Sequence, residues 1–150
     1  QALINSLIIY QVKRYNIKGR QLLKTQAKYY IADLGLRYLI CGIKGKDEGH
    51  ILENVIYLEL LRRGYNVYIG QNEENEIDFV ASTHEDTIFI QVSLSLRDSN
   101  TYEREIAPLK ALNNSYSKII LTMDEAPVKD DNGIKIIYAF DWLLNWSINR

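Results

Sequence analysis

The sequence holds one cysteine, two prolines and no long uninterrupted apolar run. A single cysteine, Cys41, cannot form an internal disulfide, and no stretch reaches the roughly 18 apolar residues that a membrane helix needs. With 47% apolar and 25% charged residues, the composition excludes a fibre or a disordered tail. We therefore expect a folded cytoplasmic protein that does not enter a membrane. Because the chain opens on Gln1 and runs directly into an apolar segment, we also expect it to belong to a longer polypeptide.

Charges of opposite sign are separated along the chain. Residues 1–46 hold nine Lys or Arg and one acid, Asp33, for a net charge of +8, whereas residues 47–150 carry −9. Clustered cations gain free energy by releasing counterions when they meet phosphates, so this segment predicts contact with nucleic acid or an acidic partner. The alternative is a solvated basic face that balances the acidic remainder. The residues predicted to meet nucleic acid are Lys13, Arg14, Lys18, Arg20, Lys24 and Lys28.

The hydrophobic pattern divides the chain into a short basic segment, residues 1–46, packed on a core of residues 47–150. The segment contains two β-branched and aromatic runs around a turn, which predict a hairpin or a small winged appendage. Apolar residues then recur with helical spacing from Asp47 to Arg63. The remaining pattern predicts strands at 65–70, 76–82 and 86–93, a helix at 102–114, strands at 118–123 and 134–139, and a helix at 141–146. This order, αβββαβ with additions, predicts an α/β (α+β) fold in which helices flank a mixed sheet.

Several polar residues interrupt these apolar runs. Alternation along a strand predicts that Asp78 lies on one face with Glu76 and Val80, opposite Ile77, Phe79 and Ala81. Gln91 and Ser93 share one face of the next strand, and Glu53 borders the apolar face of the preceding helix. We therefore expect the side chains of Glu53, Asp78 and Gln91 to converge. The structural alternatives are an ordinary exposed helix acid at Glu53 and, at Asp78, a carboxylate bound by backbone amides or an arginine.

A helix glutamate, an aspartate in an IDF strand, and an acid-x-lysine in the next strand form the pattern of the PD-(D/E)XK, or restriction-endonuclease-like, phosphodiesterases, which this chain resembles. More closely, four segments resemble the C-terminal domain of a large family of prokaryotic AAA-type ATPases, from about Ile8 to Leu144. The segments are KYYIADLGLR, GHILENVIYLELLRRGYNVYIG, EIDFVA and FIQVSLSL. The resemblance implies a restriction-endonuclease-like core. It also implies a partner domain in the same polypeptide, an N-terminal ATPase domain that would bind ATP. The phosphate-binding motif of such a domain, G-x-x-x-x-G-K-[ST], does not occur in this chain.

The resemblance also implies a degenerate catalytic site. It puts Glu53 and Asp78 at acidic positions, but Gln91 stands where the second strand acid belongs and Ser93 where the lysine belongs. Magnesium prefers several carboxylate oxygens, and the lysine positions the attacking water, so both changes remove chemistry from the site. A metal at Glu53 and Asp78 would be weak or vestigial. The nearest cation along the chain is Arg97, which is too firmly protonated to act as a base, and we expect no lysine to replace the missing one.

Three functions stay open from the sequence. The first is a nuclease-like module that has lost cleavage and binds nucleic acid or a partner protein within an AAA-type ATPase. The second is an active metal-dependent DNA endonuclease that uses a cation from elsewhere in the chain. The third is a protein-interaction or oligomerisation module that keeps only the fold. For the isolated domain we expect no cofactor and no enzymatic activity.

Overall fold

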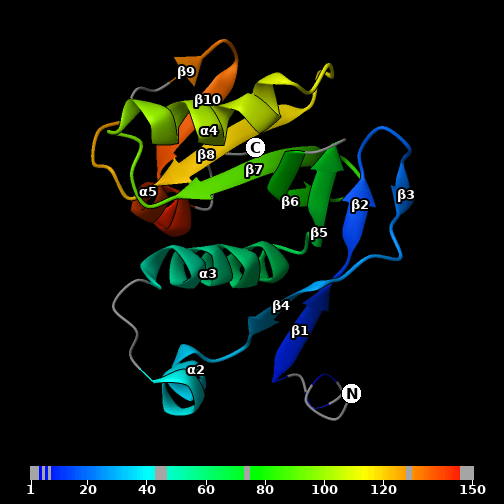
Figure 1. Cartoon of the computed structure of the whole chain (residues 1–150), viewed down its shortest axis with the longest axis vertical. Coiled ribbons are helices and arrows are strands. Elements are labelled where there is room, and N and C mark those ends of the chain that lie inside the picture. Colours follow the sequence, from blue (N-terminus) through cyan, green and yellow to red (C-terminus); the bar gives the residue numbers. More distant parts are fainter. Residues whose placement is uncertain are drawn as a thin grey trace.

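The computed structural model describes residues 4, 6, 8–42, 47–72, 75–127 and 130–145 (Figure 1). Those residues form an eight-stranded mixed sheet in the order β3-β2-β5-β6-β7-β8-β10-β9, together with a separate two-stranded ribbon of β1 and β4. In chain order the elements are β1 (Ile9–Val12), β2 (Arg14–Asn16), β3 (Gln21–Leu22), β4 (Lys28–Ile31), α2 (Leu34–Cys41), α3 (Glu48–Arg62), β5 (Asn66–Asn72), β6 (Asn75–Ser82), β7 (Thr87–Ser93), α4 (Ser99–Lys110), β8 (Ser117–Thr122), β9 (Asp130–Asp131), β10 (Ile134–Tyr138) and α5 (Ala139–Leu144). The predicted αβββαβ order and the mixed sheet flanked by helices are confirmed.

Helices cover both faces of the large sheet, which gives three layers. Figure 1 shows α3 and α5 on one side of the sheet and α4 on the other. Strands β5, β6 and β7 run antiparallel, whereas β8 pairs in parallel with both β7 and β10. Helix α4 is the crossover between β7 and β8 that a parallel pair requires. Side chains buried under α3 and α5 include Ile56, Leu60, Phe79, Ile90 and Trp142, and those under α4 include Ile106, Leu109, Val80, Phe89 and Ile120.

The first segment forms the predicted hairpin, because its two runs pair antiparallel as β1 and β4, and the residues between them add strands to the large sheet. Strand β2 pairs in parallel with β5, so β2 and β3 extend the main sheet, while β1 and β4 pair with each other. The second of the two runs forms a strand only as far as Ile31, because Asp33 caps α2 by accepting a hydrogen bond from the Leu36 backbone N–H. The expected boundary at residue 46 lies outside the described residues.

A bulge in β6 changes the side-chain pattern predicted for that strand. Gly70 of β5 opposes Ile77 and Tyr68 opposes Val80, so two residues of β6, Asp78 and Phe79, share a single partner position. As a result Phe79 packs with α3 whereas Ile77 and Val80 both pack with α4, and the predicted shared face of Ile77, Phe79 and Ala81 is wrong. Such bulges redirect side chains, and here the bulged residue is Asp78.

Gly70 allows the close approach of β5 and β6 at this irregularity. A Cβ atom at position 70 would lie 3.0 Å from Ile77 Cβ and 3.0 Å from Val80 Cγ2. A larger residue at position 70 would therefore push these two side chains away by a few tenths of an ångström or more. Within the described residues, no helix is both long and apolar enough to cross a membrane.

Candidate functional site

Three carboxylates surround the ammonium group of Lys28, which β4 carries to the edge of α3 and β6. Lys28 Nζ lies 3.0 Å from Glu53 Oε1, 2.8 Å from Glu76 Oε1 and 3.7 Å from Asp78 Oδ1. We call Lys28, Tyr30, Glu53, Glu76 and Asp78 the Lys28 cluster. The structure thus brings Glu53 and Asp78 together as expected. The expectation that no lysine approaches Asp78 is wrong, because Lys28 arrives from a strand some fifty residues earlier in the chain.

Glu53 is held by two donors that both come from β4. Its Oε1 accepts hydrogen bonds from Lys28 Nζ and, at 2.5 Å, from the Tyr30 hydroxyl. The Tyr30 ring stacks on Tyr57 of α3 with 4.4 Å between ring centroids, which fixes the position of the hydroxyl. Burial and the neighbouring Glu53 charge raise the pKa of Tyr30, so its phenol remains a proton donor at every physiological pH. His50 Nδ1 lies farther away, 3.9 Å from Glu53 Oε2.

Asp78 sits in a setting that opposes its ionisation. Its side chain is 14% exposed, and its Oδ2 accepts a hydrogen bond of 2.9 Å from the Val92 backbone N–H. Burial and the nearby Glu53 charge raise the pKa of Asp78 to about 7, against the opposing effects of Lys28 and the Val92 N–H. Near neutral pH the carboxyl of Asp78 therefore exchanges between its protonated and ionised forms.

Glu76 links the Lys28 cluster to Arg14 of β2. It forms ion pairs with both Lys28 and Arg14. Burial opposes ionisation of Glu76, but these two cations outweigh burial and hold its pKa below the usual range. For Lys28, burial lowers the pKa, yet the surrounding carboxylates hold it above the ordinary value. Two of the six residues predicted to meet nucleic acid, Arg14 and Lys28, are therefore engaged by carboxylates of the same chain.

Gln91 and Ser93 lie beside the Lys28 cluster and do not enter it. Gln91 Oε1 is 3.4 Å from the Asp78 backbone nitrogen, and its Nε2 donates at 2.9 Å to Glu105 Oε2 on α4. The predicted convergence therefore holds for Glu53 and Asp78, but Gln91 reaches the backbone of Asp78 and not its carboxylate. Ser93 Oγ donates to the Ser95 carbonyl. Arg97, expected as the nearest cation, pairs with Asp124 at 3.1 Å.

The arrangement of these donors does not fit a divalent metal ion. No group of three or more His, Cys, Asp or Glu among the described residues is placed to hold one. Lys28 Nζ already takes the central position among the carboxylates, and the Gln91 carbonyl oxygen faces a backbone N–H. A hard cation would need those oxygens for itself. In this arrangement the Lys28 ammonium supplies the positive charge that a metal would otherwise provide.

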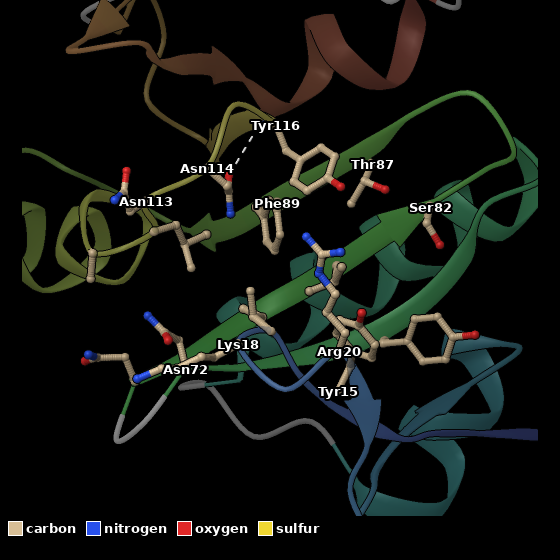
Figure 2. Close-up of a pocket in the computed structure, with 16 residues that line it drawn as sticks. Tyr15, Lys18, Arg20, Asn72, Ser82, Thr87, Phe89, Asn113, Asn114 and Tyr116 are labelled. Atoms are coloured by element: carbon tan, nitrogen blue, oxygen red, sulfur yellow. Dashed lines mark hydrogen bonds between the residues drawn. The ribbon is translucent and has the colours of Figure 1, made fainter.

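A groove on the α4 face of the sheet was not predicted from the sequence. It encloses about 740 Å³ beside the C-terminal end of α4 (Figure 2). In Figure 2, Lys18, Arg20 and Tyr15 lie along one side, and Asn113, Asn114, Tyr116 and Phe89 lie along the other. The interleaved run RYNIKGR, residues 14–20, is the sequence signal that could have pointed to it. The remaining lining residues are Ile17, Tyr68, Asn72, Asn75, Val80, Ser82, Thr87, Ala111 and Leu112.

Comparisons with known proteins agree with one another. An uncharacterised protein of Haemophilus influenzae is 39% identical over 140 residues, which cover 93% of this chain and 34% of that protein. An uncharacterised protein of Methanocaldococcus jannaschii is 30% identical over 157 residues, covering 95% of this chain and 34% of that protein. The chain thus spans about a third of the length of these curated relatives. No solved structure matches it. Residues 48–142, from α3 to α5, match the family described as a domain of unknown function, DUF4143, and the chain belongs to that family.

Proposed function

We propose that this chain is a nuclease-like module that binds nucleic acid without cutting it, as part of a longer AAA-type ATPase. The observation that carries the proposal is the division of the basic residues of the first segment into two sets. Arg14 and Lys28 pair with carboxylates of the core. The other four predicted binding residues, Lys13, Lys18, Arg20 and Lys24, are exposed.

The pairing of Arg14 and Lys28 with carboxylates supports the proposed loss of nuclease activity. Phosphodiester cleavage in nucleases of the resembled type requires a firmly held metal and an activated water. Here Lys28 forms ion pairs with Glu53 and Glu76 and lies 3.7 Å from Asp78 Oδ1, while Gln91 and Ser93 bond to other partners. Losing one such contributor typically costs about a hundredfold in rate or more, so a site that lacks several is not expected to work at a useful rate.

The second set supports binding through phosphates. Lys13, Lys18, Arg20 and Lys24 lie in the turns that flank β2 and β3, at one edge of the large sheet. Contacts from such side chains to phosphate position a nucleic acid without reading its sequence. We therefore expect binding with little sequence preference and a strong dependence on salt.

The length of the relatives supports the larger context. Since the chain spans about a third of each, most of such a protein lies in other segments. The four quoted segments of this chain resemble the C-terminal domain of AAA-type ATPases. On this resemblance, the ATP-binding domain would lie in the part of the polypeptide outside this chain. On this proposal the ATPase domain is the partner of the module within one polypeptide, in the cytoplasm.

Binding and cleavage can be tested together with the 150-residue chain. Fluorescence anisotropy with a labelled DNA duplex should show binding in EDTA that Mg²⁺ or Mn²⁺ does not strengthen, while supercoiled plasmid in buffers with these metals stays intact. Absence of binding at low salt would contradict the proposal and point to a protein partner or to an oligomerisation role.

A second candidate function is metal-dependent cleavage of DNA, and one observation favours it. Lys28 Nζ lies 3.7 Å from Asp78 Oδ1 and so brings an ammonium group to the position where the resembled nucleases need one. If this function holds, plasmid nicking in Mn²⁺ will be lost in Lys28→Met and in Asp78→Asn. It will be kept in Lys135→Met, whose exposed lysine on β10 lies outside both the cluster and the predicted nucleic-acid-binding residues. Intact plasmid with the unmodified chain would exclude it.

A further inference from the structure

We propose that the groove on the α4 face binds single-stranded nucleic acid, with bases stacked on its aromatic side chains and phosphates on Lys18 and Arg20. This inference rests on the proposed nucleic-acid binding. It adds where on the molecule the nucleic acid binds and that the bound form is single-stranded. The groove faces α4, whereas Lys28 and Glu53 lie on the α3 side, so it is distinct from the Lys28 cluster.

Four aromatic side chains line the groove, of which Tyr116 is exposed, Tyr15 and Tyr68 are half-buried and Phe89 is buried. Tyr15 and Tyr68 lie with ring centroids 5.8 Å apart on one side, and Phe89 and Tyr116 lie 5.9 Å apart on the other. Tyr116 is 47% exposed, so one face of its ring is available to a ligand. Bases stack on such rings with little regard to their identity.

The charged side chains that line the groove are cationic and therefore favour an anionic ligand. Of the described residues that line the groove, Lys18 and Arg20 are the only charged ones, and both stand on the β2–β3 turn. Figure 2 shows both near the mouth of the groove, with the Arg20 side chain extending into the space between the two sides. A cationic rim beside aromatic walls is the arrangement that tracks a nucleic-acid backbone while its bases stack.

The polar groups of the lining suit the edges of bases. The lining includes the amides of Asn72, Asn75, Asn113 and Asn114, and each amide offers donors and an acceptor. In a duplex these edges are paired and the base faces are stacked inside, so the aromatic walls could not reach them. An acidic peptide would satisfy the two cations but supplies no flat faces for the four rings. The combination therefore favours a single strand.

The test compares two probes and matched tyrosine variants. The probes are a labelled oligo(dT) of about ten nucleotides and a duplex of equal length, measured by anisotropy at constant salt. Tyr116→Ser removes a ring from the groove, Tyr116→Phe keeps it, and Tyr38→Ser removes an exposed ring from α2 as a control. We expect Tyr116→Ser to raise the Kd for oligo(dT) roughly tenfold and the Kd for the duplex less than about twofold, with the other two variants close to the unmodified chain.

The outcomes separate this inference from the proposed function. If both probes bind and Tyr116→Ser affects them equally or not at all, the groove is not the binding site, although the proposed function stands. If neither probe binds at low salt, both fail. Displacement of oligo(dT) by a polyglutamate peptide at equal charge concentration would likewise overturn the single-strand assignment. Equal unfolding midpoints in urea for all three variants show that the comparison concerns binding and not folding.

Discussion

At the scale of single residues, Lys28 has the largest consequence. The lysine that the resembled nucleases carry two positions after their second strand acid is replaced by Ser93, yet an ammonium group still lies beside Asp78. No local pattern could have predicted this, because Lys28 and Asp78 are brought together by the pairing of β1 with β4 and the packing of β4 on α3. Before the fold was known, Lys28 was one cation among nine in a basic segment.

Asp78 predicts an unusual dependence of stability on pH. Its pKa rises from 3.8 in the unfolded chain to about 7 in the folded protein, so the folded state holds the proton more firmly. The stability that this group contributes is therefore greatest below about pH 4 and is lost as pH rises to about 7. The free energy of unfolding of the unmodified chain, minus that of Asp78→Asn, should fall over this range and level off above about pH 8.

Urea unfolding of both proteins at a series of pH values measures this difference. A difference that stays constant between about pH 4 and 8, or that rises with pH, would show that folding does not raise the pKa of Asp78.

A second prediction concerns the effect of a substitution at Gln91 on stability, which acts through the hydrogen bond to Glu105. Its Nε2 donates to Glu105 Oε2, so Gln91→Glu replaces a donor with a second carboxylate. We expect the free energy of unfolding to fall by about 2 kcal/mol at neutral pH, and by less at acidic pH, where one carboxyl takes a proton. Adding Glu105→Gln restores a donor and should recover most of the loss in a double-mutant cycle. Glu103→Gln, exposed on the same helix, is the control and should not compensate.

At the scale of elements, the amide of Asn54 ties the backbone of β4 to α3, beside the contacts that Lys28 and Tyr30 make with the same helix. Asn54 is 4% exposed, and it both accepts from the Ile31 N–H and donates to the Ile31 carbonyl, each at 2.9 Å. Asn54→Ala leaves two backbone groups without these partners, which should cost about 2 kcal/mol of unfolding free energy. Asn66→Ala, at an exposed position of β5, should cost less than about 0.5 kcal/mol.

Amide hydrogen exchange provides a local readout for the same variant. The Ile31 N–H should lose protection in Asn54→Ala, whereas the amides of β7 in the sheet centre should keep theirs. Uniform loss of protection throughout the chain would mean that Asn54 supports the whole fold and does not act as a local anchor.

The elements that were predicted correctly are those whose pattern is local. Helix α3 follows from the helical spacing of its apolar residues, and Gly64, with φ of +84°, ends it. Strands β6 and β7 follow from their apolar runs. The bulge at Asp78 and Phe79 could not be predicted, because it arises from a mismatch between two strands. Nor could the parallel pairing of β2 with β5, which joins residues more than fifty positions apart.

At the scale of the whole molecule, the separation of charge along the chain becomes a partial separation in space. Arg14 and Lys28 are drawn into the acidic cluster, which leaves the exposed cations at the β2–β3 edge of the sheet. Figure 1 shows this edge at the end of the sheet away from β9 and β10. An anionic polymer is therefore expected to approach the molecule at that edge, beside the groove that Lys18 and Arg20 border.

Salt dependence tests this view quantitatively. Each lysine or arginine that contacts phosphate contributes about 0.7 to 0.9 to the slope of log K against log salt, so replacing Lys13, Lys18, Arg20 and Lys24 together by Gln should flatten the slope by roughly 3. Exchanging Arg14 for Gln should leave the slope nearly unchanged, because Glu76 already neutralises that charge, although removing the ion pair lowers stability. If Arg14→Gln flattens the slope as much as Arg20→Gln does, the Arg14–Glu76 pair opens on binding. In that case the Lys28 cluster would face the phosphate backbone, and the nucleic acid would run along the α3 side of the sheet.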